Sequence, residues 1–157
     1  LPDQSSCQQD LTLNASVMQI NGISPVLFAE GFAGHMEVAN RGKLAIIGSV
    51  AGDRGRKSNY VYGAAKGLVA RYAQGLQHRL ANTNVRVILI KPGPTDTAMT
   101  AHLKAKGLKM ADVSLVAKRI LKAISNALPI VYVPAKWKFI MMAIIHLPKT
   151  IFNKIDI

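Results

Sequence analysis

Three side chains between residues 49 and 66 have the types and the spacing for proton transfer at a carbonyl or an alcohol. Ser49 follows a short apolar run, Tyr62 comes thirteen residues later, and Lys66 comes four residues after that. Residues four apart share one face of a helix, so we expect Tyr62 and Lys66 to lie side by side. A tyrosine phenol has a reference pKa of about 10, and a nearby lysine cation stabilises the phenolate and lowers that pKa. We therefore predict that Tyr62 moves a proton while Ser49 holds the reacting oxygen.

A second tyrosine and a chance pairing are the two alternatives to this assignment. Tyr60 lies two residues before Tyr62, but the residue four positions after it is Ala64, so Tyr60 has no lysine on its helix face. A tyrosine and a lysine at this spacing, taken alone, are also consistent with an ordinary surface pair. The joint pattern is more specific, because the serine, the tyrosine and the lysine follow one another between two predicted strands.

Helices and strands alternate along the chain and place these side chains at one edge of a sheet. Apolar stretches predict helices over residues 11–40, with an interruption near Gly22 and Pro25, over 60–82, and from Asp112 or Ser114 to 126. Short apolar runs predict strands over residues 42–48, 85–90 and 128–133. Strands separated by helices form a parallel sheet between two helical layers. Ligands bind at the carboxyl ends of such strands, which is where the serine falls.

The order of these motifs resembles the short-chain dehydrogenase/reductase family. The resemblance rests on Ser49, on the segment 62–66 (Tyr-Gly-Ala-Ala-Lys) and on the segment 91–97 after the next strand, and it covers residues 1–133. It implies an α/β fold, the C-terminal part of a doubly wound, Rossmann-type parallel sheet with flanking helices. It also implies an oxidoreductase that interconverts a carbonyl and an alcohol with NAD or NADP, and the sequence leaves the choice between the two cofactors open.

The resemblance implies a role for each matching catalytic residue. Tyr62 is the general acid and base, Lys66 lowers its pKa and hydrogen-bonds the nicotinamide ribose, and Ser49 orients the substrate oxygen. Asn21 takes the place of an asparagine that holds a proton-relay water, with Asn14 as the other candidate. Without the resemblance, the Asn21-Gly22 pair indicates only an irregularity in a helix.

The segment after the second strand supplies the cofactor contacts that the resemblance implies. The resemblance counts Tyr62 and Lys66 among the cofactor-binding residues. From the segment after the second strand, Pro92, Gly93 and Thr97 would line the nicotinamide end of the same site. A tight turn after a strand is the structural interpretation of the same residues, and the two interpretations are compatible. No metal site is expected.

The glycine-rich turn with which the family's cofactor site begins has no counterpart in the sequence. The glycines at 31, 34 and 42 are too far apart to form this turn. Those at 48, 52 and 55 follow the predicted strand 42–48, whereas the family's turn follows the first strand of the fold. About 80–90 residues that form the N-terminal βαβ half are therefore expected to be absent, and the chain alone is expected to be inactive. A truncated sequence, a proteolytic or cloned fragment, and a natural half that assembles with a partner are the three explanations. Residues 43–48 would then present an exposed strand edge.

A narrower resemblance concerns the loop 53–56 and the tail 134–157. Both are similar to the ketoreductase subunit of decaprenylphosphoryl-ribose 2-epimerase and its relatives, through the Asp-Arg-Gly-Arg loop and the Met-Met, His-Leu-Pro and Ile-Phe-Asn-Lys segments. This resemblance implies a carbonyl substrate on a lipid-linked sugar. We accordingly divide the chain into a partial dehydrogenase domain (1–133) and a basic, amphipathic tail (134–157).

Charge and composition limit the other possibilities. The net charge is +12. Residues 53–157 have a net charge of +14, and residues 1–52 have a net charge of −2. A basic surface attracts phosphates, nucleic acid or anionic lipid, but no nucleic-acid-binding motif accompanies the charge, so nucleic acid is not an expected partner. One cysteine excludes a disulfide framework, and no apolar run is long enough to span a bilayer. A cytoplasmic protein is expected.

The tail and the long helices predict contacts with partners. The tail either lies at a membrane surface as a peripheral contact or packs as a helix on the domain or on another subunit. The alternative function is accordingly a catalytically inactive fragment that acts as a basic membrane-surface or interaction module. The helices 11–40 and 60–82 are more apolar than the surface helices of a monomer, which predicts a homo-oligomer that forms through them.

Overall fold

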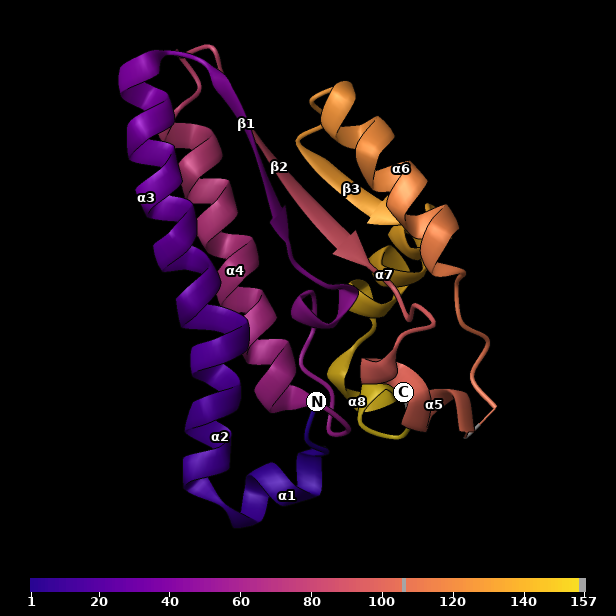
Figure 1. The fold of residues 1–157 in the computed structure, drawn as a ribbon. Coiled ribbons are helices and arrows are strands. Elements are labelled where there is room, and N and C mark those ends of the chain that lie inside the picture. Colours follow the sequence, from indigo (N-terminus) through magenta and orange to yellow (C-terminus); the bar gives the residue numbers. More distant parts are fainter. Residues whose placement is uncertain (106, 156–157) are drawn as a thin grey trace.

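A parallel sheet forms the centre of the molecule, as seen in a computed structural model that describes residues 1–105 and 107–155 (Figure 1). Within these residues the sheet has three strands in the order β1-β2-β3, and both pairings are parallel. The strands are β1 (Gly42–Ile47), β2 (Val85–Pro92) and β3 (Ile130–Val133). The predicted parallel α/β arrangement is therefore confirmed. The third strand begins at Ile130 rather than at 128, because Pro129 has no N–H group to donate to the ladder.

Alternating side chains of the sheet serve two separate cores. Leu44 and Ile46 of β1 and Leu89 of β2 pack against the first helical layer. Ile88 and Ile90, the neighbours of Leu89, are fully buried against the other layer. Successive residues of a strand point to opposite faces, so an apolar run without alternation is buried on both sides.

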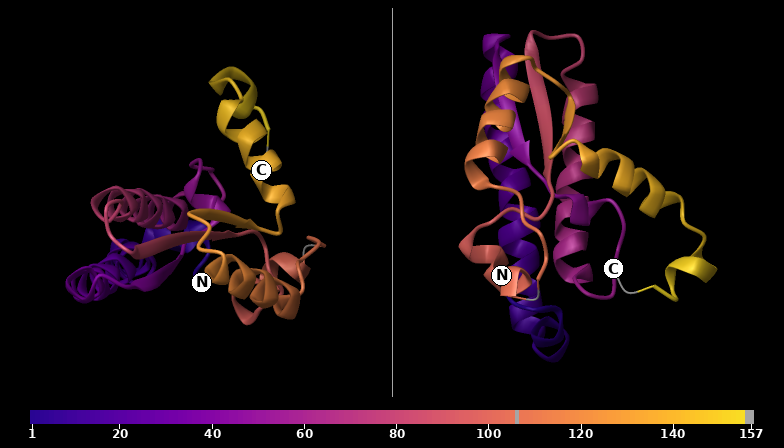
Figure 2. Two further views of the ribbon diagram at one scale, coloured as in Figure 1. Left: turned by 90° about the horizontal axis from the view of Figure 1, so that it is seen from above. Right: turned by 90° about the vertical axis from the view of Figure 1, so that its right-hand side faces the viewer.

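Two helices cover one face of the sheet, and a third covers the other (Figures 1 and 2). The elements are α3 (Ser24–Ala39) and α4 (Tyr60–Arg79), which lie side by side, and α6 (Val113–Ser125) on the opposite face. The Asp112 side chain accepts a hydrogen bond from the Leu115 N–H at 2.9 Å, so Asp112 rather than Ser114 begins α6. Helix α4 ends at Arg79, three residues before the predicted end, in a turn around Leu80.

The first long helix is interrupted close to the predicted place. Helices α1 (Gln4–Gln9) and α2 (Leu11–Met18) precede a π-helical turn, η1 (Gln19–Ile23), which leads into α3. Pro25 lies in the first turn of α3, where its missing N–H group disturbs the hydrogen-bond ladder least. A Cβ on Gly22 would lie 3.2 Å from the Ala65 Cα, so this glycine lets η1 approach α4 closely.

One edge of the sheet has no strand partner. Within the described part of the chain, β1 pairs with β2 alone, so its other edge is free of pairing. Ile47, the last residue of β1, is 48% exposed. The expected exposed edge over residues 43–48 is thus present, and such an edge is able to pair with a further strand.

The C-terminal part packs partly on the sheet. Beyond the short η3 (Ala98–Thr100) and α5 (Ala101–Ala105) come α6 and β3, and then α7 (Lys136–His146) and α8 (Lys149–Phe152). Helix α7 leaves the sheet on the side away from α6 (Figure 2), and Met141 on α7 is fully buried. The last two residues of the predicted tail, 156–157, lie outside the described residues. Among the described helices, none combines the length and the apolar character needed to cross a bilayer.

Candidate active site

Ser49 lies just beyond β1 and begins a short turn that packs on α4. Its hydroxyl accepts a hydrogen bond from the Ala51 N–H at 3.1 Å and so caps η2 (Val50–Gly52). Two glycines allow this turn to touch α4: a Cβ on Gly52 would lie 2.6 Å from the Lys66 carbonyl carbon, and a Cβ on Gly63 would lie 3.0 Å from the Ala51 oxygen. Side chains at either place would push Ser49 away from the helix.

The three residues predicted to move a proton come together at this contact. The Ser49 side chain interacts with the Tyr62 phenol and lowers its pKa. Lys66 lies one turn further along α4, with its Nζ 5.7 Å from the centre of the Tyr62 ring. Lys66 is only 8% exposed, and its ammonium donates to the Ile47 carbonyl at the end of β1 at 3.3 Å. A hydroxyl, a phenol and a cation therefore meet at the carboxyl end of β1.

The pKa of Tyr62 departs from the expected direction. Burial raises the pKa of this phenol, and the hydrogen bond with Ser49 opposes the rise. Burial also lowers the pKa of the Lys66 ammonium. Burial therefore dominates the pKa of Tyr62 among the described residues, and the expected lowering of this pKa by Lys66 stays a prediction. The physical reason is that the ammonium bonds the Ile47 carbonyl and is itself removed from water, so desolvation dominates both groups.

Asn21 occupies the π-helical turn that packs on α4. Its Nδ2 donates to the Val17 carbonyl at 3.0 Å, and the next residue, Gly22, touches Ala65 beside Lys66. The other candidate, Asn14, donates to the Cys7 carbonyl at 3.3 Å and so contacts α1. The role of Asn21 in holding a water stays a prediction.

The residues predicted to contact the nicotinamide follow β2. Gly93 is buried, and its N–H donates to the Val133 carbonyl at 2.9 Å. A Cβ on Gly93 would lie 2.0 Å from Nε1 of Trp137, so the indole of α7 covers this glycine on that side. Thr97 is exposed and caps η3 together with Thr100. The tight-turn interpretation is present in the structure, while the contacts of Pro92, Gly93 and Thr97 with a cofactor stay predictions.

A second cluster with a tyrosine and a lysine was not predicted from the sequence. Lys91 of β2 forms an ion pair with Asp53, and their side chains are 8% and 3% exposed. The Tyr132 hydroxyl of β3 donates to the second Asp53 oxygen at 2.8 Å. Burial and the Asp53 carboxylate together raise the pKa of Tyr132. A lysine inside an apolar strand was the available signal, since a buried lysine requires a partner.

Arg54, the residue after Asp53, fastens the tail to the same loop. Its guanidinium donates to the carbonyls of Ile144, Ile145 (3.1 Å) and Leu147 (2.7 Å) at the end of α7. It also lies over the Phe152 ring at 3.7 Å. The last carbonyls of a helix lack a full set of partners within it, so a guanidinium that bonds the carbonyls around the end of α7 holds this helix against the loop.

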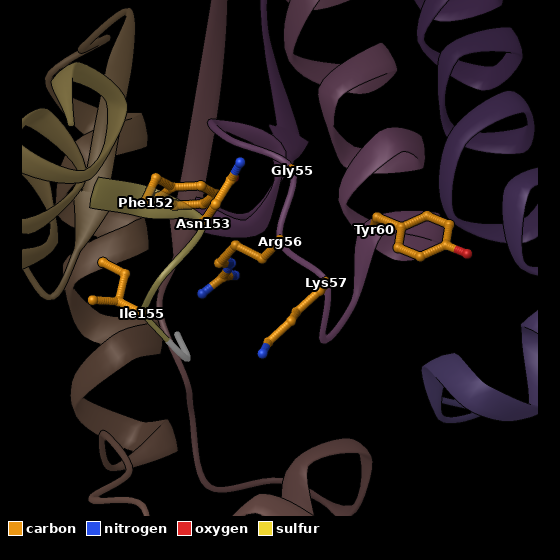
Figure 3. Close-up of a pocket in the computed structure, with 7 residues that line it drawn as sticks. All are labelled: Gly55, Arg56, Lys57, Tyr60, Phe152, Asn153 and Ile155. Carbon is orange, nitrogen blue, oxygen red and sulfur yellow. The ribbon is translucent and has the colours of Figure 1, made fainter. Parts of the chain in front are cut away.

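A cleft of about 350 Å³ lies between this loop and the tail. Gly55, Arg56, Lys57 and Tyr60 line one side, and Phe152, Asn153 and Ile155 line the other (Figure 3). No cluster of three or more metal-ligating side chains occurs in the part of the chain that the structure describes.

Comparisons with known proteins agree with this geometry. The sequence model for the family described as short chain dehydrogenase matches residues 3–107. The chain is 30% identical over 158 residues to an uncharacterized oxidoreductase of Mycobacterium tuberculosis, covering 98% of this chain and 61% of the relative. It is 33% identical over 111 residues to an uncharacterized oxidoreductase of Staphylococcus aureus. This match covers 71% of this chain and 48% of the relative. These relatives are uncharacterized oxidoreductases rather than the epimerase ketoreductase subunit, so the narrower resemblance is not supported.

Solved structures share the fold. A short chain dehydrogenase from Burkholderia cenocepacia in complex with NADP superposes with a TM-score of 0.77 at 23% identity, over 87% of this chain and 58% of that one. A bulky-bulky ketone specific alcohol dehydrogenase from Comamonas testosteroni gives a TM-score of 0.69 at 20% identity. The match covers 94% of this chain and 56% of that one. The chain spans about three fifths of the length of these proteins and of the mycobacterial relative. On its sequence match, and with the fold in agreement, the chain belongs to the short chain dehydrogenase family.

Proposed function

We propose that this chain carries the proton-transfer site of an NAD(P)-dependent oxidoreductase that interconverts a carbonyl and an alcohol. The observation that supports this most strongly is the meeting of Ser49, Tyr62 and Lys66 where η2 packs on α4. A hydroxyl donor, a phenol and a desolvated cation at the carboxyl end of a parallel strand are the groups that the reaction needs from the protein.

The raised pKa of Tyr62 suits the reductive direction. A phenol whose pKa lies above its usual value is protonated at neutral pH and has a proton to give. Ser49, hydrogen-bonded to the same phenol, holds the substrate oxygen beside it. When Tyr62 gives up its proton, the phenolate forms next to the Lys66 ammonium, which stabilises the new negative charge. A bound nicotinamide supplies or accepts the hydride.

The residues near the site fit part of a nicotinamide cofactor. Among the described residues, Lys66 donates one hydrogen bond, to the Ile47 carbonyl, and an ammonium has three N–H groups, so it retains donors for the hydroxyls of a ribose. Pro92 and Thr97 are the better candidates for the nicotinamide end, because Trp137 covers Gly93 on the side where a Cβ would point. Titration of the protein with each cofactor measures which of NAD and NADP it binds more tightly.

The test replaces Tyr62 in the whole protein. Tyr62→Phe removes the proton that the reaction transfers, so turnover of a carbonyl panel with NADH or NADPH should fall by about 10²- to 10⁴-fold. Binding of the reduced cofactor, followed by its fluorescence, should stay nearly unchanged. Tyr60→Phe removes the neighbouring, 44% exposed phenol and is the matched control. Turnover retained in Tyr62→Phe would rule out the proposal.

A second candidate function concerns the tail. Phe139 and Met142 on α7 are 65% and 54% exposed, and Lys136, Lys138 and Lys149 carry positive charge nearby. We propose that this surface contacts anionic lipid. Vesicles that contain roughly 30% phosphatidylserine mimic an anionic membrane. They should bind the protein less strongly as the salt concentration rises. Equal binding to neutral vesicles, or none to either, would contradict this candidate.

The first helical layer supports an association between copies. Leu27, Phe28 and Phe32 of α3 are 63%, 68% and 56% exposed, which is unusual for three large apolar side chains within two turns. We propose that a second copy of the chain covers them. Phe28→Glu should lower the mass measured by light scattering, while Lys118→Glu on α6 should leave it unchanged.

A further inference from the structure

A tryptophan from the tail lies at the edge of the sheet where the candidate catalytic side chains meet. Strand β1 stays bonded to β2 as far as Gly48, and β2 stays bonded to β3 as far as Gly93. The residues that follow the three strands are therefore neighbours, about 4.8 Å apart from one strand to the next. Ser49 follows β1, Gly93 follows β2, and Trp137 lies in the first turn of α7, which follows β3.

The indole lies on the face of the sheet that α4 covers. Leu89 of β2 packs in the core beneath α3 and α4, whereas Ile90 packs in the core beneath α6, and the same alternation directs Gly93 toward the α4 side. A Cβ on Gly93 would lie 2.0 Å from Nε1 of Trp137, so the indole occupies that side. Helix α7 also leaves the sheet on this side, away from α6 (Figure 2). Tyr62 on α4 and Trp137 on α7 thus lie over the same face, at the same edge.

The side of α7 that carries the indole is apolar. Trp137, Met141 and Ile144 follow one another at a spacing of four and three residues, which places them on one face of the helix. Met141 is fully buried, whereas Trp137 and Ile144 are partly exposed. The indole therefore keeps apolar surface for a further contact at the edge of the sheet.

The position of α7 is fixed relative to the catalytic residues. Arg54 belongs to the loop that joins Ser49 to Tyr62, and its guanidinium bonds the carbonyls around the C-terminal end of α7. The buried Met141 holds the middle of the helix. The indole near the other end accordingly has a defined place beside the candidate site.

We propose that Trp137 contacts an apolar substituent of the substrate, which is a ketone or secondary alcohol with a hydrocarbon chain of several carbons, and so determines the preference for chain length. Since the substituent belongs to the carbonyl substrate, the inference rests on the proposed oxidoreductase function. When the reacting oxygen lies at Ser49 and Tyr62, a substituent that extends along the carboxyl edge passes Gly93 and reaches the indole. Each methylene group that leaves water there favours binding by about fourfold.

A series of methyl ketones measures this contact in the whole protein. With the nicotinamide cofactor that binds more tightly, kcat/KM should rise about two- to fourfold per methylene from 2-butanone through 2-hexanone to 2-octanone. Trp137→Ala should reduce the rise to less than about 1.5-fold per methylene, mainly through KM, and should change kcat/KM for 2-butanone by less than about threefold. Trp137→Phe keeps a smaller ring and should give an intermediate rise, which tests the contact with less disturbance of the fold.

A matched control and three outcomes make the series decisive. Leu121→Ala on α6 removes a 64% exposed apolar side chain over the other face of the sheet, and it should leave the series unchanged. An equal loss for all three ketones in Trp137→Ala would overturn the inference, because the indole would then only support the fold. A steeper rise in Trp137→Ala would overturn it as well, because the indole would then obstruct the substituent. A wild type that reduces all three ketones equally well would do the same.

Binding without cofactor separates this inference from the proposed function. Trp137 is the only tryptophan among the 157 residues, and the difference in emission between the wild type and Trp137→Phe isolates its signal in the whole protein. We expect 2-octanol to move this emission saturably to shorter wavelength, and 2-butanol to require a concentration at least about tenfold higher. No shift with 2-octanol would overturn the inference and leave the oxidoreductase intact. A saturable shift without turnover of any ketone would overturn the oxidoreductase and support the apolar contact of Trp137.

Discussion

Two clusters of the same residue types lie on the carboxyl side of the sheet, and they differ in how their charges are balanced. In one, Lys66 lies beside Tyr62 and donates to a backbone carbonyl, with no ion pair in the part of the chain that the structure describes. In the other, Lys91 lies beside Tyr132, and the buried Asp53 carboxylate bonds both of them. Each lysine is at least nine-tenths buried.

Under the proposed function, the difference separates a site that moves a proton from one that only holds the structure. A carboxylate between a lysine and a tyrosine fixes both protons, because moving either one would leave a buried charge without its partner. The Tyr62 phenol interacts with a neutral serine hydroxyl, and a cation with spare donors lies beside it, so a negative charge that forms on Tyr62 has a counter-ion next to it. Both clusters lie on the carboxyl side of the sheet and contain a tyrosine and a lysine. The buried carboxylate of Asp53 is what distinguishes their two roles.

Replacement of Lys66 should have the largest effect on activity. Lys66→Met removes the cation that stabilises the Tyr62 phenolate, so turnover should fall by about 10²- to 10⁴-fold. Its free energy of unfolding should stay equal or rise, because an unpaired desolvated ammonium gives way to an apolar chain of similar size. Steady-state kinetics and urea unfolding measure the two quantities. A stability loss of several kcal/mol would show that Lys66 is structural as well.

Removal of the acid from the other cluster should reduce stability most. Asp53→Asn leaves the Lys91 ammonium buried without a counter-ion, which should cost about 3–5 kcal/mol of unfolding free energy. Asp96→Asn is the control, since Asp96 and its partner Lys104 are 44% and 60% exposed, and its cost should be below about 1 kcal/mol. Equal losses in the two variants would contradict the structural role of the buried pair.

The smallest expected effect is the alkaline behaviour of Tyr132. Its pKa is raised in the folded state, so its stabilising contribution is present below a pH of about 10 and is lost as the pH rises further. Tyr132→Phe should therefore lose less stability between pH 9 and 11 than the wild type, by at most about 1.4 kcal/mol per pH unit. Urea unfolding at several pH values measures the slopes, and identical slopes would contradict the assignment.

Local patterns in the sequence predict the elements and the first cluster well. The spacing of Tyr62 and Lys66 is a property of a single helix, and Ser49 follows directly from the end of a strand, so short-range geometry brings them close. The members of the second cluster are 38 to 79 residues apart, and only the packing of two strands and a loop joins them.

Charge balance was harder to predict than position. The pKa of Tyr62 shifts upward because burial outweighs the interaction with Ser49, and burial depends on how η2 packs on α4 through Gly52 and Gly63. Trp137 likewise covers Gly93 only because α7 folds back onto the end of β2. Both contacts join separate elements through tertiary packing, which no periodicity encodes.

The most direct test compares the two tyrosines in one experiment. Tyr62→Phe and Tyr132→Phe each remove a single hydroxyl, and both kcat/KM with NADPH or NADH and the free energy of unfolding are measured on the whole protein. We expect Tyr62→Phe to lose turnover by about 10²-fold or more with a stability change below about 1 kcal/mol. We expect Tyr132→Phe to lose about 1–3 kcal/mol of stability and to keep its turnover within a few fold. Loss of turnover in Tyr132→Phe with retention in Tyr62→Phe would contradict the assignment of the catalytic site.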